Sequence, residues 1–95
     1  MKKPDVAIEI GRRLGIPVQA SWVANGETIT GDWHRAVGSV LGIPFTSDKP
    51  AHMQAMLTSL GVTWDPARHE SRKNPLPDGD NLMKAAYEDL LAALP

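Results

Sequence analysis

The chain has 95 residues, and its ten basic and eleven acidic residues give a net charge of −1 at pH 7. This length leaves room for one domain with a modest core, and it excludes a multi-domain enzyme, a TIM barrel and a complete Rossmann domain. The balanced charge indicates no obligatory partner of either sign.

Apolar residues recur at helical spacing in four segments. We expect helices over about residues 4–14, 31–41, 49–60 and 82–94. A glycine follows each of the first three segments, at Gly15, Gly42 and Gly61, and an apolar residue comes after each glycine. This order is typical of a left-handed residue that closes a helix, so at least two of these glycines should have a positive φ.

The two halves of the chain share a pattern. In the first half, Lys3-Pro4 stands before Leu14-Gly15-Ile16. In the second half, Lys49-Pro50 stands at the same spacing before Leu60-Gly61-Val62. The matched spacing predicts an internal duplication.

We expect two helix–connector–helix repeats, at about residues 3–46 and 49–95, within a single domain that spans residues 1–95. Packed through their apolar faces, the repeats would form a mainly α, compact four-helix domain. Ile10 and Met56 occupy matching positions, so both should be buried.

The two connectors between the paired helices differ. The first, at residues 18–23, alternates apolar and polar residues before Asn25-Gly26, which predicts one short β element. The second, at residues 63–77, contains Trp64 and three prolines. It is expected to be a long surface loop with one helical turn after Asp65-Pro66.

A basic run at residues 68–73 of the second connector is the strongest functional signal. The candidate contacts are Arg68, His69, Arg72 and Lys73, supported by Arg12 and Arg13. Arginine presents a planar set of donors that fits phosphate or carboxylate. The run is predicted to bind DNA or another phosphate-bearing partner. Its alternatives are an acidic protein partner and a solvated loop in which an arginine pairs with Glu70 or Asp65.

Residues 9–26 add a resemblance to a known class of proteins. They contain the sequence Glu9-Ile10-Gly11-Arg12-Arg13-Leu14-Gly15-Ile16-Pro17, followed by Trp22 and Gly26. This part of the chain resembles the first half of bacterial helix-turn-helix DNA-binding domains, in which a helix ends in such a turn and a recognition helix follows. The resemblance implies that basic side chains contact phosphates and that the second helix enters the major groove. For Arg12 and Arg13, the structural alternative is compensation of the helix dipole at the end of the first helix.

Signatures of catalysis and of metal binding are missing from the sequence. It contains no cysteine, and its three histidines fall in separate segments, so no metal site is predicted. No nucleophile elbow, dinucleotide-binding or phosphate-loop signature occurs. The three tryptophans are expected in the core, and the alternative for Trp64 is stacking on a base.

Nothing in the sequence indicates a signal peptide or a membrane span. The basic start of the chain is followed at once by Pro4, Asp5 and Glu9, which interrupt any apolar core of a signal peptide. No apolar run approaches the length that crosses a membrane. We therefore expect a soluble cytoplasmic protein that has no membrane partner.

These observations together predict a small non-catalytic binding module without cofactor or metal, which binds DNA or another phosphate-bearing partner through its basic loop. One alternative is a protein-interaction or adaptor domain that uses an apolar groove. Another is an accessory domain of a larger enzyme, because Ala93-Leu94-Pro95 resembles the start of a linker. A single basic face would favour nucleic acid, whereas a bare apolar patch would favour a protein.

Overall fold

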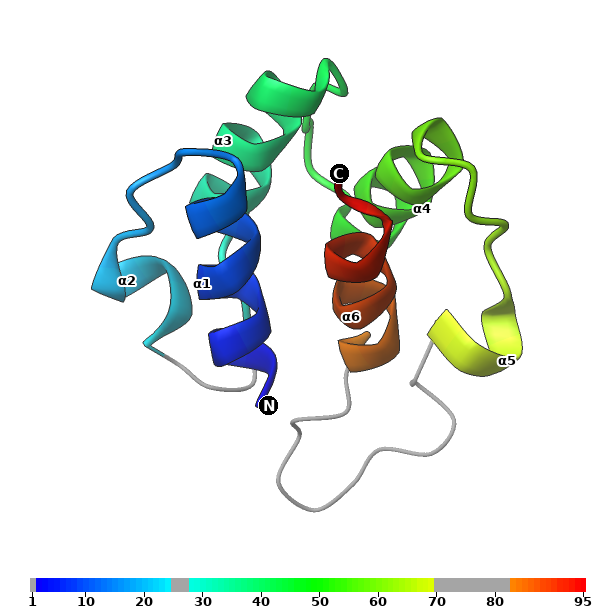
Figure 1. The fold of residues 1–95 in the computed structure, drawn as a ribbon, viewed down its shortest axis with the longest axis horizontal. Coiled ribbons are helices and arrows are strands. Elements are labelled where there is room, and N and C mark those ends of the chain that lie inside the picture. Colours follow the sequence, from blue (N-terminus) through cyan, green and yellow to red (C-terminus); the bar gives the residue numbers. More distant parts are fainter. Residues whose placement is uncertain (1, 25–27, 70–82) are drawn as a thin grey trace.

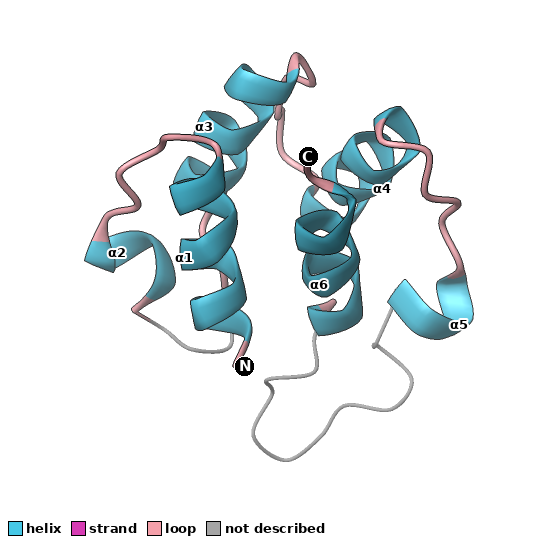
Figure 2. Ribbon diagram, viewed as in Figure 1, coloured by secondary structure: helices cyan, strands magenta, loops and turns pink. Residues whose placement is uncertain are grey.

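The computed structural model describes residues 2–24, 28–69 and 83–95 of the chain. Six helices lie in these ranges: α1 (Lys3–Arg13), α2 (Ala20–Val23), α3 (Gly31–Leu41), α4 (Lys49–Ser59), α5 (Pro66–His69) and α6 (Lys84–Ala93). None of the residues in these ranges belongs to a strand (Figure 2). The mainly helical fold that the apolar periodicity predicted is therefore confirmed.

The four predicted helices correspond to the four long ones, and they differ from the prediction only at their ends. α3 has the predicted bounds, and α1, α4 and α6 begin or end within one or two residues of them. The helical turn predicted after Asp65-Pro66 is α5. Asp48 caps α4, where its carboxylate accepts a hydrogen bond from the Ala51 backbone N–H at 3.0 Å.

The short β element predicted for the first connector is wrong, because Ala20–Val23 form the helical turn α2. The Trp22 N–H donates to the Gln19 carbonyl at 3.0 Å. Val18 lies against α1 so closely that a Cβ on Gly11 would overlap its side chain, and Val23 is buried in the core. These two anchors fix both ends of the connector. A turn between them pairs its own backbone, whereas a lone strand needs a partner strand.

The helices form two groups that face each other across the core. α1 and α6 lie side by side at the centre and run in the same direction, whereas α2 and α5 lie on opposite sides of the molecule (Figure 1). α4 packs on both α3 and α6, α2 contacts α1 and α3, and α5 contacts α6. The core therefore lies between a first group, α1 to α3, and a second group, α4 to α6.

Trp33 is a large side chain at the centre of this core and has no exposed surface. Its indole N–H donates to the Ala7 carbonyl of α1 at 3.0 Å, and its ring meets that of Tyr87 edge-on, with centroids 5.3 Å apart. Ile10 and Met56 are both fully buried, as predicted. Trp22 and Trp64 are partly buried and pack against the core from outside.

All three glycines predicted to close helices have a positive φ, of 74° at Gly15, 78° at Gly42 and 85° at Gly61. The residue after each glycine donates its N–H to a carbonyl in the last turn of the helix. These bonds are Ile16 to Gly11 at 2.8 Å, Ile43 to Gly38 at 2.8 Å and Val62 to Leu57 at 2.9 Å. The three helices thus end in the motif that the sequence indicated.

Replacing Gly15, Gly42 or Gly61 with alanine is expected to lower the free energy of unfolding by about 1 kcal/mol each, because a Cβ at positive φ approaches the next carbonyl. A Cβ at these positions meets no other atom within 4 Å, so backbone strain is the whole cost. Urea denaturation at pH 7 measures the loss, with Ser39→Ala on the exposed surface of α3 as the control. Wild-type stability in all three variants would contradict the assignment.

Candidate functional site

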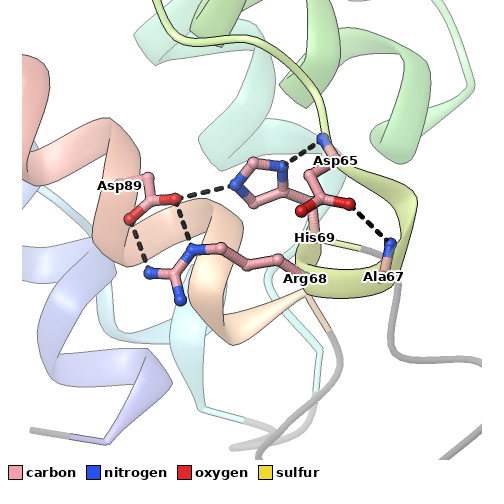
Figure 3. A network of polar contacts seen from close by, with 5 residues as sticks. All are labelled: Asp65, Ala67, Arg68, His69 and Asp89. Atoms are coloured by element: carbon pink, nitrogen blue, oxygen red, sulfur yellow. Dashed lines mark hydrogen bonds and ion pairs between the residues drawn. The ribbon is translucent and has the colours of Figure 1, made fainter.

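A polar cluster joins α5 to α6 at the beginning of the predicted basic run (Figure 3). The Asp89 carboxylate of α6 accepts two hydrogen bonds from the Arg68 guanidinium, from Nε at 2.9 Å and from Nη2 at 2.8 Å. The same carboxylate lies 2.7 Å from Nε2 of His69. A two-point contact of this kind fixes both position and orientation, so Asp89 holds α5 on α6.

His69 uses both ring nitrogens within this cluster. Its Nδ1 accepts a hydrogen bond from the Asp65 backbone N–H at 2.8 Å, so the ring proton lies on Nε2 and is donated to Asp89. The ring is only 2% exposed and lies on the Trp64 indole, with centroids 4.9 Å apart. Although the sequence suggested His69 as a phosphate contact, its ring has neither a surface position nor an unused nitrogen.

Electrostatic attraction between Arg68 and Asp89 stabilises the cluster further. The hydrogen bond from Arg68 lowers the pKa of Asp89 to about 2, against the opposing effect of burial, and the contact with His69 lowers it as well. The same bond to Asp89 raises the pKa of Arg68. Asp89 is therefore ionised at every pH at which the protein is ordinarily studied.

The other arginines proposed as phosphate contacts lie at the end of α1 and are paired within that helix. Arg12 binds the Glu9 carboxylate through Nε at 3.0 Å and through a second, shorter contact, and Arg13 binds it through Nε at 3.4 Å. The hydrogen bond from Arg12 lowers the pKa of Glu9. Arg72 and Lys73 lie outside the described residues.

The described arginines of the two predicted basic groups do not lie together. α5, which carries Arg68, lies at one edge of the molecule beyond α6, whereas α1, whose C-terminal end carries Arg12 and Arg13, lies on the other side of α6 (Figure 1). Arg35 is also paired, with Asp32 one turn earlier in α3 at 2.6 Å. Each arginine in the described part of the chain therefore faces a carboxylate, and these arginines form no single basic face.

A second polar cluster, absent from the sequence prediction, lies inside the core. His34 of α3 contacts His52 of α4 through the two Nδ1 atoms at 2.9 Å, and its Nε2 lies 2.7 Å from the Tyr87 hydroxyl of α6. His52 completes the chain with Nε2 at 2.7 Å from the Ile43 carbonyl. One signal was present in the sequence, because His52 stands four residues before Met56 on the apolar face of its helix.

The acceptor at the end of this chain determines where every proton lies. A carbonyl only accepts, so His52 donates from Nε2 to Ile43 and its Nδ1 accepts from Nδ1–H of His34. Nε2 of His34 then accepts the Tyr87 hydroxyl proton. In this arrangement the neutral forms of the two histidines and of the tyrosine make all of these hydrogen bonds. Burial, followed by repulsion from His52 and Lys49, lowers the pKa of His34 to about 3, and burial raises the pKa of Tyr87.

A pocket of about 360 Å³ opens on the outer side of this cluster, at the C-terminal half of α3. Its lining residues are Arg35, Gly38, Ser39, Gly42, Pro44 and Phe45. The Phe45 ring packs on both histidines, with its centroid 5.4 Å from that of His34 and 5.2 Å from that of His52. This pocket lies beside a buried polar cluster, and we take it as the candidate binding site.

The described ranges contain neither a metal-binding cluster nor a membrane-spanning helix. They contain no group of three or more histidine, aspartate or glutamate side chains that is arranged to hold a metal ion. No helix in them has both the length and the apolar character needed to cross a membrane. Comparison of the chain with models of known families, with curated proteins and with solved structures finds no match.

Proposed function

We propose that the chain is a small non-catalytic binding module whose partner is a protein. The observation that carries this proposal is that the four described arginines are paired with carboxylates on three different helices, so these arginines form no common basic face for a nucleic acid. The open pocket on α3 instead has mostly apolar and small lining residues. This combination favours the protein-binding alternative over the DNA-binding prediction.

The state of the three histidines supports a non-catalytic role. General acid–base catalysis needs a side chain that exchanges a proton with the reacting group. His34, His52 and His69 each direct both ring nitrogens to partners inside the protein. All three rings are at least 95% buried, so none presents a nitrogen to a substrate.

We further propose that the domain is a tandem duplication of a three-helix unit, α1 to α3 and α4 to α6. α4 and α5 begin 46 residues after α1 and α2, at Lys49 against Lys3 and at Pro66 against Ala20. α1 packs on α6 as α4 packs on α3, and α2 contacts α3 as α5 contacts α6. These two reciprocal pairs of contacts are consistent with a two-fold relation between the units, whereas the α4–α6 contact has no counterpart of similar extent between α1 and α3.

A phosphate-bearing partner is the second candidate, and one observation favours it. Lys3 and Lys49, at matching positions in the two proposed units, both line a smaller pocket of about 180 Å³. The basic run also continues through Arg72 and Lys73, outside the described residues. If this second candidate is right, these residues bind DNA, and the helix-turn-helix resemblance of residues 9–26 supports the same function.

Two measurements on the wild-type chain distinguish these candidates. If the partner is a protein, selection from a phage-displayed random peptide library should enrich peptides that compete with one another. Fluorescence anisotropy with duplex and single-stranded DNA at low salt should then show a dissociation constant weaker than about 10⁻⁴ M, the weak limit of non-specific binding.

The opposite pair of results would overturn the proposal. These are the absence of enriched peptides and tight DNA binding that falls steeply with salt, as release of counterions requires. The double variant Arg72→Ala/Lys73→Ala should then bind DNA more weakly while its circular dichroism spectrum stays that of the wild type. This double variant avoids Arg68, whose loss would disturb the contact with Asp89.

A further inference from the structure

We propose that the α3 pocket binds a protein partner through an aromatic side chain that stands next to a carboxylate. This inference rests on the proposed function and adds the site and the chemistry of the partner. It is carried by the shape of the pocket, by the single charge in its lining and by the rigidity of its walls.

The lining leaves room for a flat apolar group. Gly38 and Gly42 have no side chains, and the Phe45 ring and Pro44 provide flat apolar surfaces. The volume of about 360 Å³ is enough for one large side chain with its neighbour. A ring inserted from a partner protein fits this shape, and such aromatic anchors supply much of the energy of protein interfaces.

Arg35 is the only charged residue among the six that line the pocket. Its guanidinium lies 5.9 Å from the centroid of the Phe45 ring, a contact that holds the charge beside the apolar wall. Its ion pair with Asp32 is exposed on both sides, and exposed pairs of this kind are weak. A partner carboxylate can therefore bind the same guanidinium, so the complementary segment is acidic next to its aromatic residue.

The walls of the pocket are fixed before a partner arrives. The Ile43 N–H binds the Gly38 carbonyl at 2.8 Å, and the Ile43 carbonyl accepts from His52 at 2.7 Å. A Cβ on Gly38 would lie 2.5 Å from Nε2 of His52, so glycine is required where the loop crosses the helix. Phe45 packs on both buried histidines. A preformed site avoids the cost of ordering its residues on binding.

Titration of the ¹⁵N-labelled protein with acetyl-Gly-Trp-Glu-Gly-amide tests the chemistry. The backbone amide signals that shift should be those of the pocket, namely Gly38, Ser39, Gly42 and Phe45. A peptide with glutamine in place of glutamate should bind at least about threefold more weakly, and one with alanine in place of tryptophan should lose binding. In an Arg35→Gln variant, the glutamate and glutamine peptides should bind equally.

A matched pair of variants tests the location. Ser39→Tyr places a ring in the mouth of the pocket, and Ala92→Tyr places one at an exposed position of α6 that does not line the pocket. Both side chains lie on the surface, so both variants should keep the wild-type circular dichroism spectrum and urea midpoint. Ser39→Tyr should weaken peptide binding about tenfold or more, whereas Ala92→Tyr should leave it unchanged.

Three results would overturn this inference. The first is the absence of amide signal shifts at peptide concentrations up to about 5 mM, which excludes even millimolar affinity. The second is a set of shifts centred on residues outside the pocket, and the third is equal peptide binding by the two tyrosine variants. Failure of the site is distinguishable from failure of the proposed function. Peptides enriched by display that bind the Ser39→Tyr variant as tightly as the wild type would exclude this pocket and retain a protein partner.

Discussion

The protein is expected to lose about 2 kcal/mol of its free energy of unfolding between pH 7 and pH 5, because His34 resists protonation in the folded state. Its pKa is about 3 in the folded protein, against an ordinary value of 6.5. The unfolded chain therefore binds one more proton than the folded chain between these values. Stability contributed by neutral His34 is complete above pH 6.5 and is lost progressively as the pH falls toward 3.

Urea denaturation at pH 7, 6 and 5 measures this loss, and His34→Gln is the informative variant. It should be less stable than the wild type at pH 7 by about 2 kcal/mol, because it disturbs the contacts of His52 and Tyr87. Its stability should nevertheless change less between pH 7 and pH 5. Asp89 does not contribute in this window, because its pKa lies at about 2. An NMR titration in which the His34 ring protonates near pH 6.5 would contradict the prediction.

Replacing Asp89 with alanine is expected to lower the free energy of unfolding by about 3 kcal/mol at pH 7, since a buried donor loses its charged acceptor. The donor is Nε2–H of His69, whose ring is 2% exposed. Arg68 loses its two-point contact as well, but its side chain is 54% exposed, and water replaces the carboxylate there. Arg68→Ala alone should therefore cost less than about 1 kcal/mol.

The relative stabilities of a series of variants separate the contribution of the His69 contact from that of the Arg68 contact. Asp89→Asn keeps a carbonyl oxygen that can accept from His69, so its stability should fall between those of Asp89→Ala and the wild type. Glu88→Ala, at the exposed neighbouring position of α6, is the matched control and should have almost no effect. Hydrogen exchange at the Asp65 and His69 amides should accelerate in Asp89→Ala, because α5 is held on α6 by this carboxylate. Equal stability of Asp89→Ala and Glu88→Ala would contradict the role assigned to the cluster.

The histidine cluster and the Asp89 cluster show why the partners of the polar side chains were harder to predict than the helices. The sequence placed Arg68 and His69 in a basic run, and their chemistry as isolated residues suggested a phosphate site. The structure brings to them a carboxylate from 20 or 21 residues further along the chain. His34 likewise finds Tyr87 at a separation of 53 residues. Pairings at such distances depend on how the helices pack, and no local pattern records them.

The sequence by itself determined the four long helices, their glycine caps and the buried positions of Ile10 and Met56. Each of these depends on interactions within a few residues: apolar spacing along one helix, or a left-handed glycine that allows the next N–H to reach the last turn. The tertiary structure alone decided the conformation of the first connector, where contacts at Val18 and Val23 favoured a helical turn over a strand. It also decided which carboxylate each described arginine pairs with and the charge state of His34, because the pKa of a side chain is set by the groups that folding places around it.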